Sequence, residues 1–214
     1  MAESQFSGQV IADVIEVRFP FSGKISKIAK KVGDLVKSGE IIAGLDRKFF
    51  QTELDKELSD YDRTRAEFEI FVKKYGEPAD EISKYQKIQM QSLLNASVKA
   101  VELAKFRLDS CDLVSPVSGQ ILDDGSNRVG LNISPASNAY KILDTSSVRF
   151  QISLSPDKLS ILSPQSKGVV LINETQHPVT LAAPYLSGIY YLLDAKFIEI
   201  KDLPVGLTGK LSIS

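Results

Sequence analysis

A six-residue phrase that occurs twice constrains the fold of this chain most strongly. Residues 20–25 read Pro-Phe-Ser-Gly-Lys-Ile, and residues 116–121 read Pro-Val-Ser-Gly-Gln-Ile. Proline and glycine at matching offsets before an apolar residue are typical of a turn that leads into a strand. The segment between the two copies is charged and has helical periodicity. We therefore expect one small β-domain, split into two halves, with a helical hairpin inserted between them.

The composition excludes several classes of function. The chain has 214 residues, of which 43% are hydrophobic and 25% are charged, as in a globular protein. Its net charge of −1 gives no general electrostatic reason to bind nucleic acid. The single cysteine cannot form an internal disulfide, and one histidine with two methionines argues against a transition-metal site. No apolar run is long enough to span a bilayer, and the first residues lack the features of a signal peptide.

The insert is predicted to form two antiparallel helices. A heptad pattern begins after Asp46, a suitable N-cap, and Gly76-Glu77-Pro78 ends the first helix near Tyr75. The second helix is predicted over residues 79–109. The predicted contact positions of the first helix are Leu54, Tyr61, Phe68 and Tyr75, with Leu58, Arg65 and Val72 between them. Those of the second helix are Ile82, Leu93, Ala96, Ala100 and Leu103, with Leu94, Val98 and Val101 beside them.

The remaining sequence has the pattern of short strands and turns. Six β-runs are expected after residue 147, at 148–154, 169–172, 179–181, 188–192, 197–200 and 210–213, and their spacing favours a small antiparallel barrel. The fold class is therefore mainly β with a helical insert. The expected domains are a β-domain in two halves (14–46 and 112–144), a helical hairpin (47–111) and a β-barrel (145–214 with 1–13).

In this order of a split β-domain, a helical hairpin and a small barrel, the chain resembles the periplasmic adaptor subunits of efflux pumps and type I secretion systems, also called membrane fusion or HlyD-like proteins. The first half of the family's lipoyl-like (barrel-sandwich hybrid) domain resembles Pro20-x-Ser22-Gly23-x-Ile25, followed by Gly33-Asp34 and Gly39-Glu40. The second half resembles Leu113-x-Ser115-Pro116-x-Ser118-Gly119-x-Ile121, and Leu203-Pro204-x-Gly206 resembles the closing strand of the barrel. We expect Gly23, Gly33, Gly39 and Gly119 to serve as turn residues.

The resemblance implies a non-catalytic adaptor that links an inner-membrane transporter, of RND or ABC type, to an outer-membrane exit duct. It also implies a homo-oligomeric ring, a trimer or hexamer, in the periplasm. The family's export signal or anchor is missing from this chain, so we expect a segment absent from it to provide the attachment to the inner membrane. Drug, metal, peptide and lipid cargoes all remain open.

The tip of the hairpin is the expected partner-binding site, because loops at the ends of rigid elements often bind partners. Its candidate residues are Arg65, Lys73, Lys74, Tyr75, Glu77, Asp80 and Ser83. Many family members dock through an Arg, a Leu four residues later and a Ser seven residues after that. Here Glu67 follows Arg63 and Glu69 follows Arg65, so the docking motif is degenerate or absent. An envelope scaffold whose hairpin binds a partner other than a duct is the alternative.

The sequence contains no pattern that indicates catalysis or a bound cofactor. Cys111 has no second histidine to pair with, and His177 has no carboxylate pattern around it. A biotinyl or lipoyl carrier would need an exposed lysine at the tip of the turn that joins the two half-domains. In this chain the predicted helical hairpin replaces that turn. Lys48 falls at their base, so a carrier domain is the weakest alternative.

Overall fold

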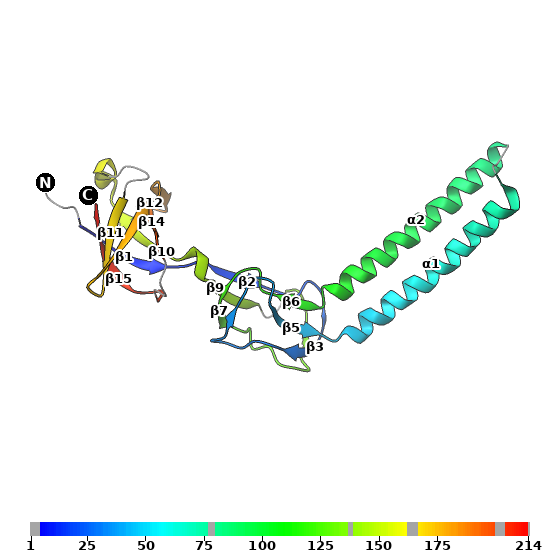
Figure 1. Cartoon of the computed structure of the whole chain (residues 1–214), viewed down its shortest axis with the longest axis horizontal. Helices are drawn as coiled ribbons and strands as arrows, with labels where there is room; N and C mark the ends of the chain where they lie inside the picture. The colour runs from blue at the N-terminus through cyan, green and yellow to red at the C-terminus, as the bar shows by residue number, and fades with distance from the viewer. Residues whose placement is uncertain (1–4, 77–79, 137–138, 162–166, 200–203, 214) are drawn as a thin grey trace.

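The computed structural model describes residues 5–76, 80–136, 139–161, 167–199 and 204–213. The molecule is elongated: a β-barrel lies at one end, short strands form the middle, and two long helices project from the other side (Figure 1). The predicted fold class, mainly β with a helical hairpin inserted into a split domain, is confirmed.

The two helices run antiparallel and have equal length. Helix α1 spans Arg47–Tyr75 and helix α2 spans Glu81–Asp109, 29 residues each, so that each is about 44 Å long. The predicted cap of α1 is confirmed, because the Asp46 carboxylate accepts the backbone N–H of Lys48 at 3.0 Å. Helix α2 begins two residues later than predicted, because Asp80 caps it.

The contact seam of the hairpin differs from the predicted one. Inward positions recur at alternating spacings of four and three residues. On α1 the seam positions are Phe50, Leu54, Glu57, Tyr61, Thr64, Phe68 and Phe71, and the half-buried Glu53, Asp60 and Val72 lie beside them. On α2 the seam positions are Ser83, Lys87, Met90, Leu94, Ser97, Val101, Ala104 and Leu108, and the half-buried Val98, Ala100 and Arg107 lie beside them.

The prediction of buried or half-buried contact positions was therefore right for Leu54, Tyr61, Phe68 and Val72 of α1 and wrong for Tyr75, which is exposed. On α2 it was right for Ala100 and wrong for the other contact positions. The predicted contact residues Ile82, Leu93, Ala96 and Leu103 are exposed, whereas Leu94 and Val101, which were placed beside the seam, lie in it. On α1, Leu58 and Arg65 are exposed too. The physical reason is that the seam admits polar residues such as Glu57 and Thr64, so apolar character alone does not identify it.

The middle part consists of two four-stranded sheets with matching strand orders, β2-β9-β7-β4 and β6-β5-β3-β8. Their strands before the helices are β2 (Val14–Val17), β3 (Gly23–Ile28), β4 (Leu35–Val36) and β5 (Ile41–Leu45). Those after the helices are β6 (Asp112–Val114), β7 (Gly119–Asp123), β8 (Asn132–Ile133) and β9 (Tyr140–Asp144). Each copy of the repeated phrase leads into an equivalent strand, β3 or β7.

The two halves are interlocked by equivalent hydrogen bonds around the isoleucine of each copy. The N–H of Gly33 donates to the carbonyl of Ile121 at 2.8 Å, and the N–H of Ile121 donates to Asp34 at 3.0 Å. In the other half, Gly130 donates to Ile25 at 2.8 Å and Ile25 donates to Leu131 at 2.9 Å. Both isoleucines are buried. Each half therefore supplies the turn that completes the other.

The four predicted turn glycines divide into two kinds. Gly33 and Gly39 have φ of 93° and 81°, a backbone conformation that favours glycine. Gly23 and Gly119 instead begin strands, which corrects their prediction as turn residues. At Gly119 a Cβ would overlap the carbonyl oxygen of Leu143, so this glycine is required by the close approach of β7 and β9.

The barrel is a sheet closed on itself. Its strands are β1 (Gln5–Ile11), β10 (Arg149–Leu154), β11 (Lys167–Ile172), β12 (Thr175–Leu181), β13 (Tyr185–Ser187), β14 (Tyr190–Phe197) and β15 (Thr208–Ile213). The order is β10-β1-β15-β11-β12-β14-β13, and pairing of β10 with β14 closes the ring and leaves β13 at its edge. Two short 3₁₀ helices, η1 (Thr145–Ser147) and η2 (Pro156–Ile161), flank β10.

Most strands of the barrel are longer than predicted, β12 and β14 by the largest margin. Strand β14, Tyr190–Phe197, takes in the last three residues of the expected run 188–192, continues through Asp194 and ends at Phe197, the first residue of the expected run 197–200. Arg149 on the neighbouring strand β10 forms an ion pair with Asp194 at 3.0 Å, so this charge is accommodated inside a strand. The core of the barrel includes the fully buried Phe150, Val170 and Leu211.

Candidate functional site

Hydrogen bonds fix the two helix ends at the tip of the hairpin. Gly76 ends α1 with φ of 62°, and its N–H donates to the carbonyl of Val72 at 2.9 Å. Asp80 caps α2 by accepting the backbone N–H of Ser83 at 2.9 Å. Hydrogen bonds from Ser83 hold the pKa of Asp80 below its ordinary value. Glu77, predicted as a tip residue, lies outside the described residues.

The last turn of α1 carries a compact aromatic and basic group. Lys73 and Lys74 lie at the C-terminal end of the helix, where positive charge is favourable. The Nζ of Lys74 lies 5.0 Å from the centroid of the Tyr75 ring. The Tyr75 ring in turn lies 4.9 Å from that of Phe71, measured between centroids. The Tyr75 ring therefore packs against Phe71 and Lys74 on α1 and is still half-exposed beside the gap between the helices.

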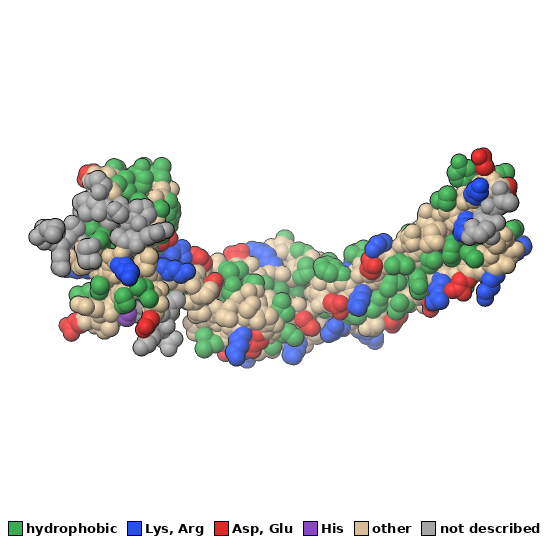
Figure 2. Space-filling model, turned by 45° about the horizontal axis from the view of Figure 1, so that its top comes forward, with side chains coloured by type: hydrophobic (Ala, Val, Ile, Leu, Met, Phe, Trp, Pro, Cys, Tyr) green, Lys and Arg blue, Asp and Glu red, His purple; other side chains and the backbone are tan. Residues whose placement is uncertain are grey.

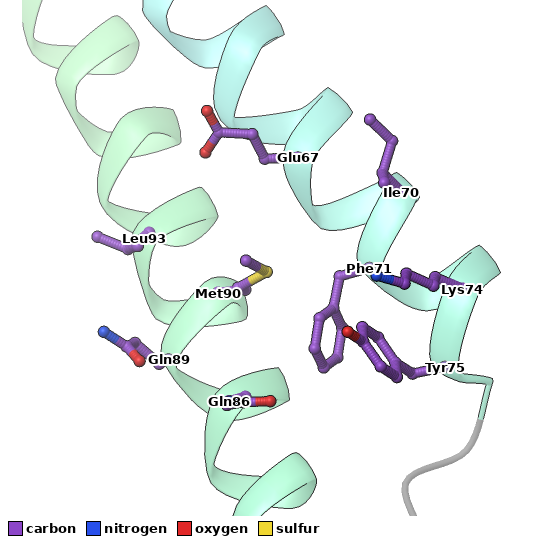
Figure 3. Close-up of a pocket in the computed structure, with 9 residues that line it drawn as sticks. All are labelled: Glu67, Ile70, Phe71, Lys74, Tyr75, Gln86, Gln89, Met90 and Leu93. Atoms are coloured by element: carbon purple, nitrogen blue, oxygen red, sulfur yellow. The ribbon is translucent and has the colours of Figure 1, made fainter.

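A groove of about 550 Å³ lies between the two helices next to the tip (Figure 3). Its lining residues are Glu67, Ile70, Phe71, Lys74 and Tyr75 of α1 and Gln86, Gln89, Met90 and Leu93 of α2. Phe71 and Met90 point toward one another between the helices, and Ile70 and Leu93 lie at the two rims. Ile70 is 64% exposed and Leu93 is 54% exposed. The groove thus offers an apolar floor and apolar rims to a partner side chain or helix.

The structure brings only some of the predicted tip residues to this groove. Lys74 and Tyr75 line it. Lys73 is exposed but does not line it, and Ser83 is half-buried in the seam. Arg65 is engaged elsewhere, because its Nε forms an ion pair with Glu69 at 2.8 Å.

Sequence reasoning missed the apolar part of the groove. Ile70, Phe71 and Met90 were not singled out, and Leu93 was assigned to the seam. One signal could have revealed them: α2 has no charged residue between Lys87 and Lys99. An exposed helical segment that keeps no charge is typical of a surface that a partner covers.

Exposed apolar side chains continue along α2 on both sides of Leu93, the rim residue of the groove. Ile82, Leu93 and Leu103 are 72%, 54% and 51% exposed. Figure 2 shows hydrophobic side chains spread along the projecting hairpin between charged ones. We refer to these three residues as the α2 stripe.

The residues considered for catalysis or for a bound cofactor, Cys111, His177 and Lys48, lie in surroundings that do not suit those roles. Cys111 is buried, its thiol donates to the carbonyl of Arg107 at 3.5 Å, and burial raises its pKa. A buried thiol of raised pKa is a poor nucleophile. The His177 ring packs edge-on against Phe197 at 5.9 Å. Lys48 lies in the first turn of α1, not at a hairpin tip. Among the described residues, no group of three or more His, Cys, Asp or Glu side chains could hold a metal ion.

In the described part of the chain, no helix combines the length and the apolar character needed to cross a membrane.

No family model matches the sequence, and no curated protein matches it significantly. Solved structures do match. A chimeric protein of MacA and MexA, which carries the α-hairpin of Pseudomonas aeruginosa MexA, has a TM-score of 0.80 and 20% identity over 99% of this chain and 80% of its own. The membrane fusion protein Spr0693 of Streptococcus pneumoniae has a TM-score of 0.79 and 18% identity over 99% of this chain and 98% of its own.

The periplasmic adaptor protein EmrA has a TM-score of 0.51 and 13% identity, over 99% of this chain and 98% of its own. The likeness in these comparisons spans the barrel, the split domain and the hairpin together, because each covers 99% of the chain. The chain therefore has the fold of the membrane fusion and periplasmic adaptor proteins.

Proposed function

We propose that the chain is a non-catalytic adaptor that links an inner-membrane transporter, of RND or ABC type, to an outer-membrane exit duct. The observation that carries this proposal is the separation of two different elements along one elongated molecule. The hairpin holds an apolar groove at its tip, and the closed barrel lies at the opposite end of the molecule (Figure 1). Such a molecule can contact two partners that are far apart.

The names of the structural neighbours support this proposal. One neighbour, from Bacteroides eggerthii, is described as a candidate efflux transporter protein, and others are called membrane fusion or periplasmic adaptor proteins. We propose the same working parts for this chain: a lipoyl-like domain (14–46 and 112–144), a hairpin (47–111) and a barrel domain (145–214 with 1–13). We place it in the periplasm, attached to the inner membrane.

The adaptor would act as a homo-oligomeric ring, a trimer or hexamer. The α2 stripe supports this part of the proposal, because exposed apolar side chains on a rod offer a lateral contact to a neighbouring hairpin. A ring presents several tip grooves to one duct at once, so that modest single contacts combine into strong binding. The function of each copy would be to assemble and seal the conduit, without chemistry on the cargo.

In-cell photo-crosslinking from the rims of the groove tests the proposal. A crosslinking amino acid is placed at Ile70 or at Leu93 in the full-length protein, and captured species are identified by mass spectrometry. Gln91 is the matched control, because it is exposed on the same helix but does not line the groove. Capture of an outer-membrane duct protein from both rims, and not from Gln91, is expected. Equal capture from all three positions, or no capture, would contradict the assignment of the groove.

One observation favours the second candidate, an envelope scaffold with a partner other than a duct. Arg65 is held by Glu69, and Glu67 occupies the position four residues after Arg63. The docking motif expected from the resemblance is therefore not presented at the tip. Capture of a different envelope protein from Ile70 and Leu93 would support this candidate.

A further inference from the structure

The β13–β14 hairpin of the barrel exposes an apolar tip that the adaptor proposal does not use. Leu186, Ile189 and Tyr190 are 63%, 80% and 55% exposed. Ser187 pairs with Tyr190, so that Gly188 and Ile189 form a two-residue turn, and Gly188 has φ of 63°. Glycine at the first position of such a turn is typical of tight, well-defined hairpins. The turn therefore holds Ile189 outward.

The segment that forms this tip carries no charge. No Lys, Arg, Asp or Glu occurs from Gln176 to Leu193. The next charged residue, Asp194, is engaged by Arg149 at the barrel wall. A hollow beside the tip is lined by Tyr190 and Leu154 together with uncharged residues, Gln5, Phe6, Ser7, Ser153 and Ser155. Asp157 is an acidic group next to this hollow, because its carboxylate accepts the Ser155 hydroxyl at 3.2 Å. Figure 2 shows hydrophobic side chains gathered at the top of the barrel.

The tip lies at the end of the barrel away from the rest of the molecule. Strand β10 begins at Arg149, next to η1 and the split domain, and ends at Leu154. Leu154 pairs with Tyr191, so the β13–β14 turn is at the far end of β10. In a ring of copies built from this fold, the tip would face whatever surface the barrel end meets.

We propose that this tip inserts into the surface of a lipid bilayer. Leu186 and Ile189 would enter the boundary of the acyl chains, and the Tyr190 ring would lie at the level of the headgroups, where tyrosine is favoured. The proposal deepens the adaptor function, on which it rests for the identity of the membrane: the barrel end would face the inner membrane.

The small size of the tip favours a bilayer over a protein partner. A stable protein interface takes about 20–30 residues from each side, whereas the tip offers a few side chains on a protruding turn. Insertion into lipid requires no matching surface, because each apolar side chain gains from its own transfer. Strand β13 also has three residues, which leaves few backbone groups for an added strand.

A second copy of the chain fits the tip less well. A hollow with apolar walls that include Leu35, Leu122 and Val205 lies at the junction of barrel and split domain, which is the other end of the barrel. A neighbour's tip could enter it only if the two copies were shifted along the barrel. Repeated head-to-tail contacts with such a shift produce an open array and not a closed ring.

The chain contains no tryptophan, so a single introduced tryptophan reports on its own position. The variant Ile189→Trp is mixed with vesicles of phosphatidylethanolamine and phosphatidylglycerol, with or without brominated acyl chains. Leu171→Trp is the matched control, because Leu171 is an exposed apolar residue on β11. The emission of Ile189→Trp is expected to shift to shorter wavelength and to be quenched by the brominated lipid, and that of Leu171→Trp is not.

Flotation of the vesicles with bound protein, carried out with variants that contain no introduced tryptophan, completes the test. Ile189→Asp is expected to lower vesicle binding by about tenfold or more, whereas Leu171→Asp leaves it unchanged. Equal emission in both tryptophan variants, or vesicle binding unaffected by Ile189→Asp, would overturn the proposal. Capture of a transporter protein from a crosslinker at Ile189, without vesicle binding, would also overturn it in favour of a protein contact. Protein-free vesicles contain no duct or transporter, so failure here is distinct from failure of the adaptor function.

Discussion

The two copies of the repeated phrase should respond very differently to the same substitution. A Cβ at Gly119 would overlap the carbonyl oxygen of Leu143 and lie 2.9 Å from its carbonyl carbon. Because both of these are backbone atoms, β7 and β9 must move apart. A Cβ at Gly23 would lie 3.1 Å from a terminal methyl group of Leu45, and a side chain can rotate away.

The expected cost follows from the contacts that separation of β7 and β9 would break. Two or three ladder hydrogen bonds contribute about 1 kcal/mol each. Loosened packing of the buried Ile121 and Ile142 brings the total for Gly119→Ala to about 3–5 kcal/mol. Gly23→Ala should cost about 1 kcal/mol, because only a flexible side chain must adjust.

Hydrogen exchange read by mass spectrometry measures both variants locally, which is necessary because the parts of this chain need not unfold together. Peptides that cover β7 and β9 should lose most of their protection in Gly119→Ala and little in Gly23→Ala, with the barrel strands unchanged in both. Equal loss of protection in the two variants would refute the close approach of β7 to β9.

Three further outcomes are expected. Tyr140 is fully buried and its hydroxyl oxygen has no hydrogen-bond partner in the described structure, so Tyr140→Phe should raise the local free energy of unfolding by about 1 kcal/mol in hydrogen exchange. Burial raises the pKa of Tyr140 to about 12, so the free energy of unfolding of the wild type should fall as the pH rises from about 10 toward 12, and it should fall less in Tyr140→Phe. Denaturant titrations followed by circular dichroism at each pH measure this free energy. An equal fall with pH in the two proteins would contradict the prediction. Asp80→Ala should cost about 1 kcal/mol, seen as faster exchange confined to the first turns of α2; unchanged exchange there would show that Asp80 is not an effective cap. Leu93→Glu should reduce capture of the tip partner about tenfold in pull-down experiments. It should change the free energy of unfolding by less than about 0.5 kcal/mol, because Leu93 is exposed. A large loss of stability would show that Leu93 is packed between the helices.

The limits of α1 and the split of the middle domain could be predicted from local signals. Asp46 and Gly76 bound the first helix, and the repeated phrase marks the start of β3 and β7. These features depend on a few residues whose backbone preferences are strong. The interlocking of the halves around Ile25 and Ile121 is not readable from either copy alone, because it joins turns that are distant in sequence.

The faces of the helices could not be predicted in the same way. A rod of two helices covers only one side of each, so apolar residues such as Ile82 and Leu103 remain exposed while Lys87 and Ser97 enter the seam. Hydrophobic periodicity then favours the wrong face of α2. The groove escaped prediction for the same reason, because its rim residue Leu93 had been assigned to the interior.

The most direct test of the adaptor account is simultaneous capture from the two ends of the same molecule in cells. One crosslinker replaces Leu93 at the hairpin groove, and another replaces Lys167, an exposed residue at the start of barrel strand β11. The account predicts an outer-membrane duct protein from Leu93 and an inner-membrane transporter from Lys167, joined in one crosslinked product. Capture of proteins from a single membrane at both ends would contradict the claim that this chain links two membranes.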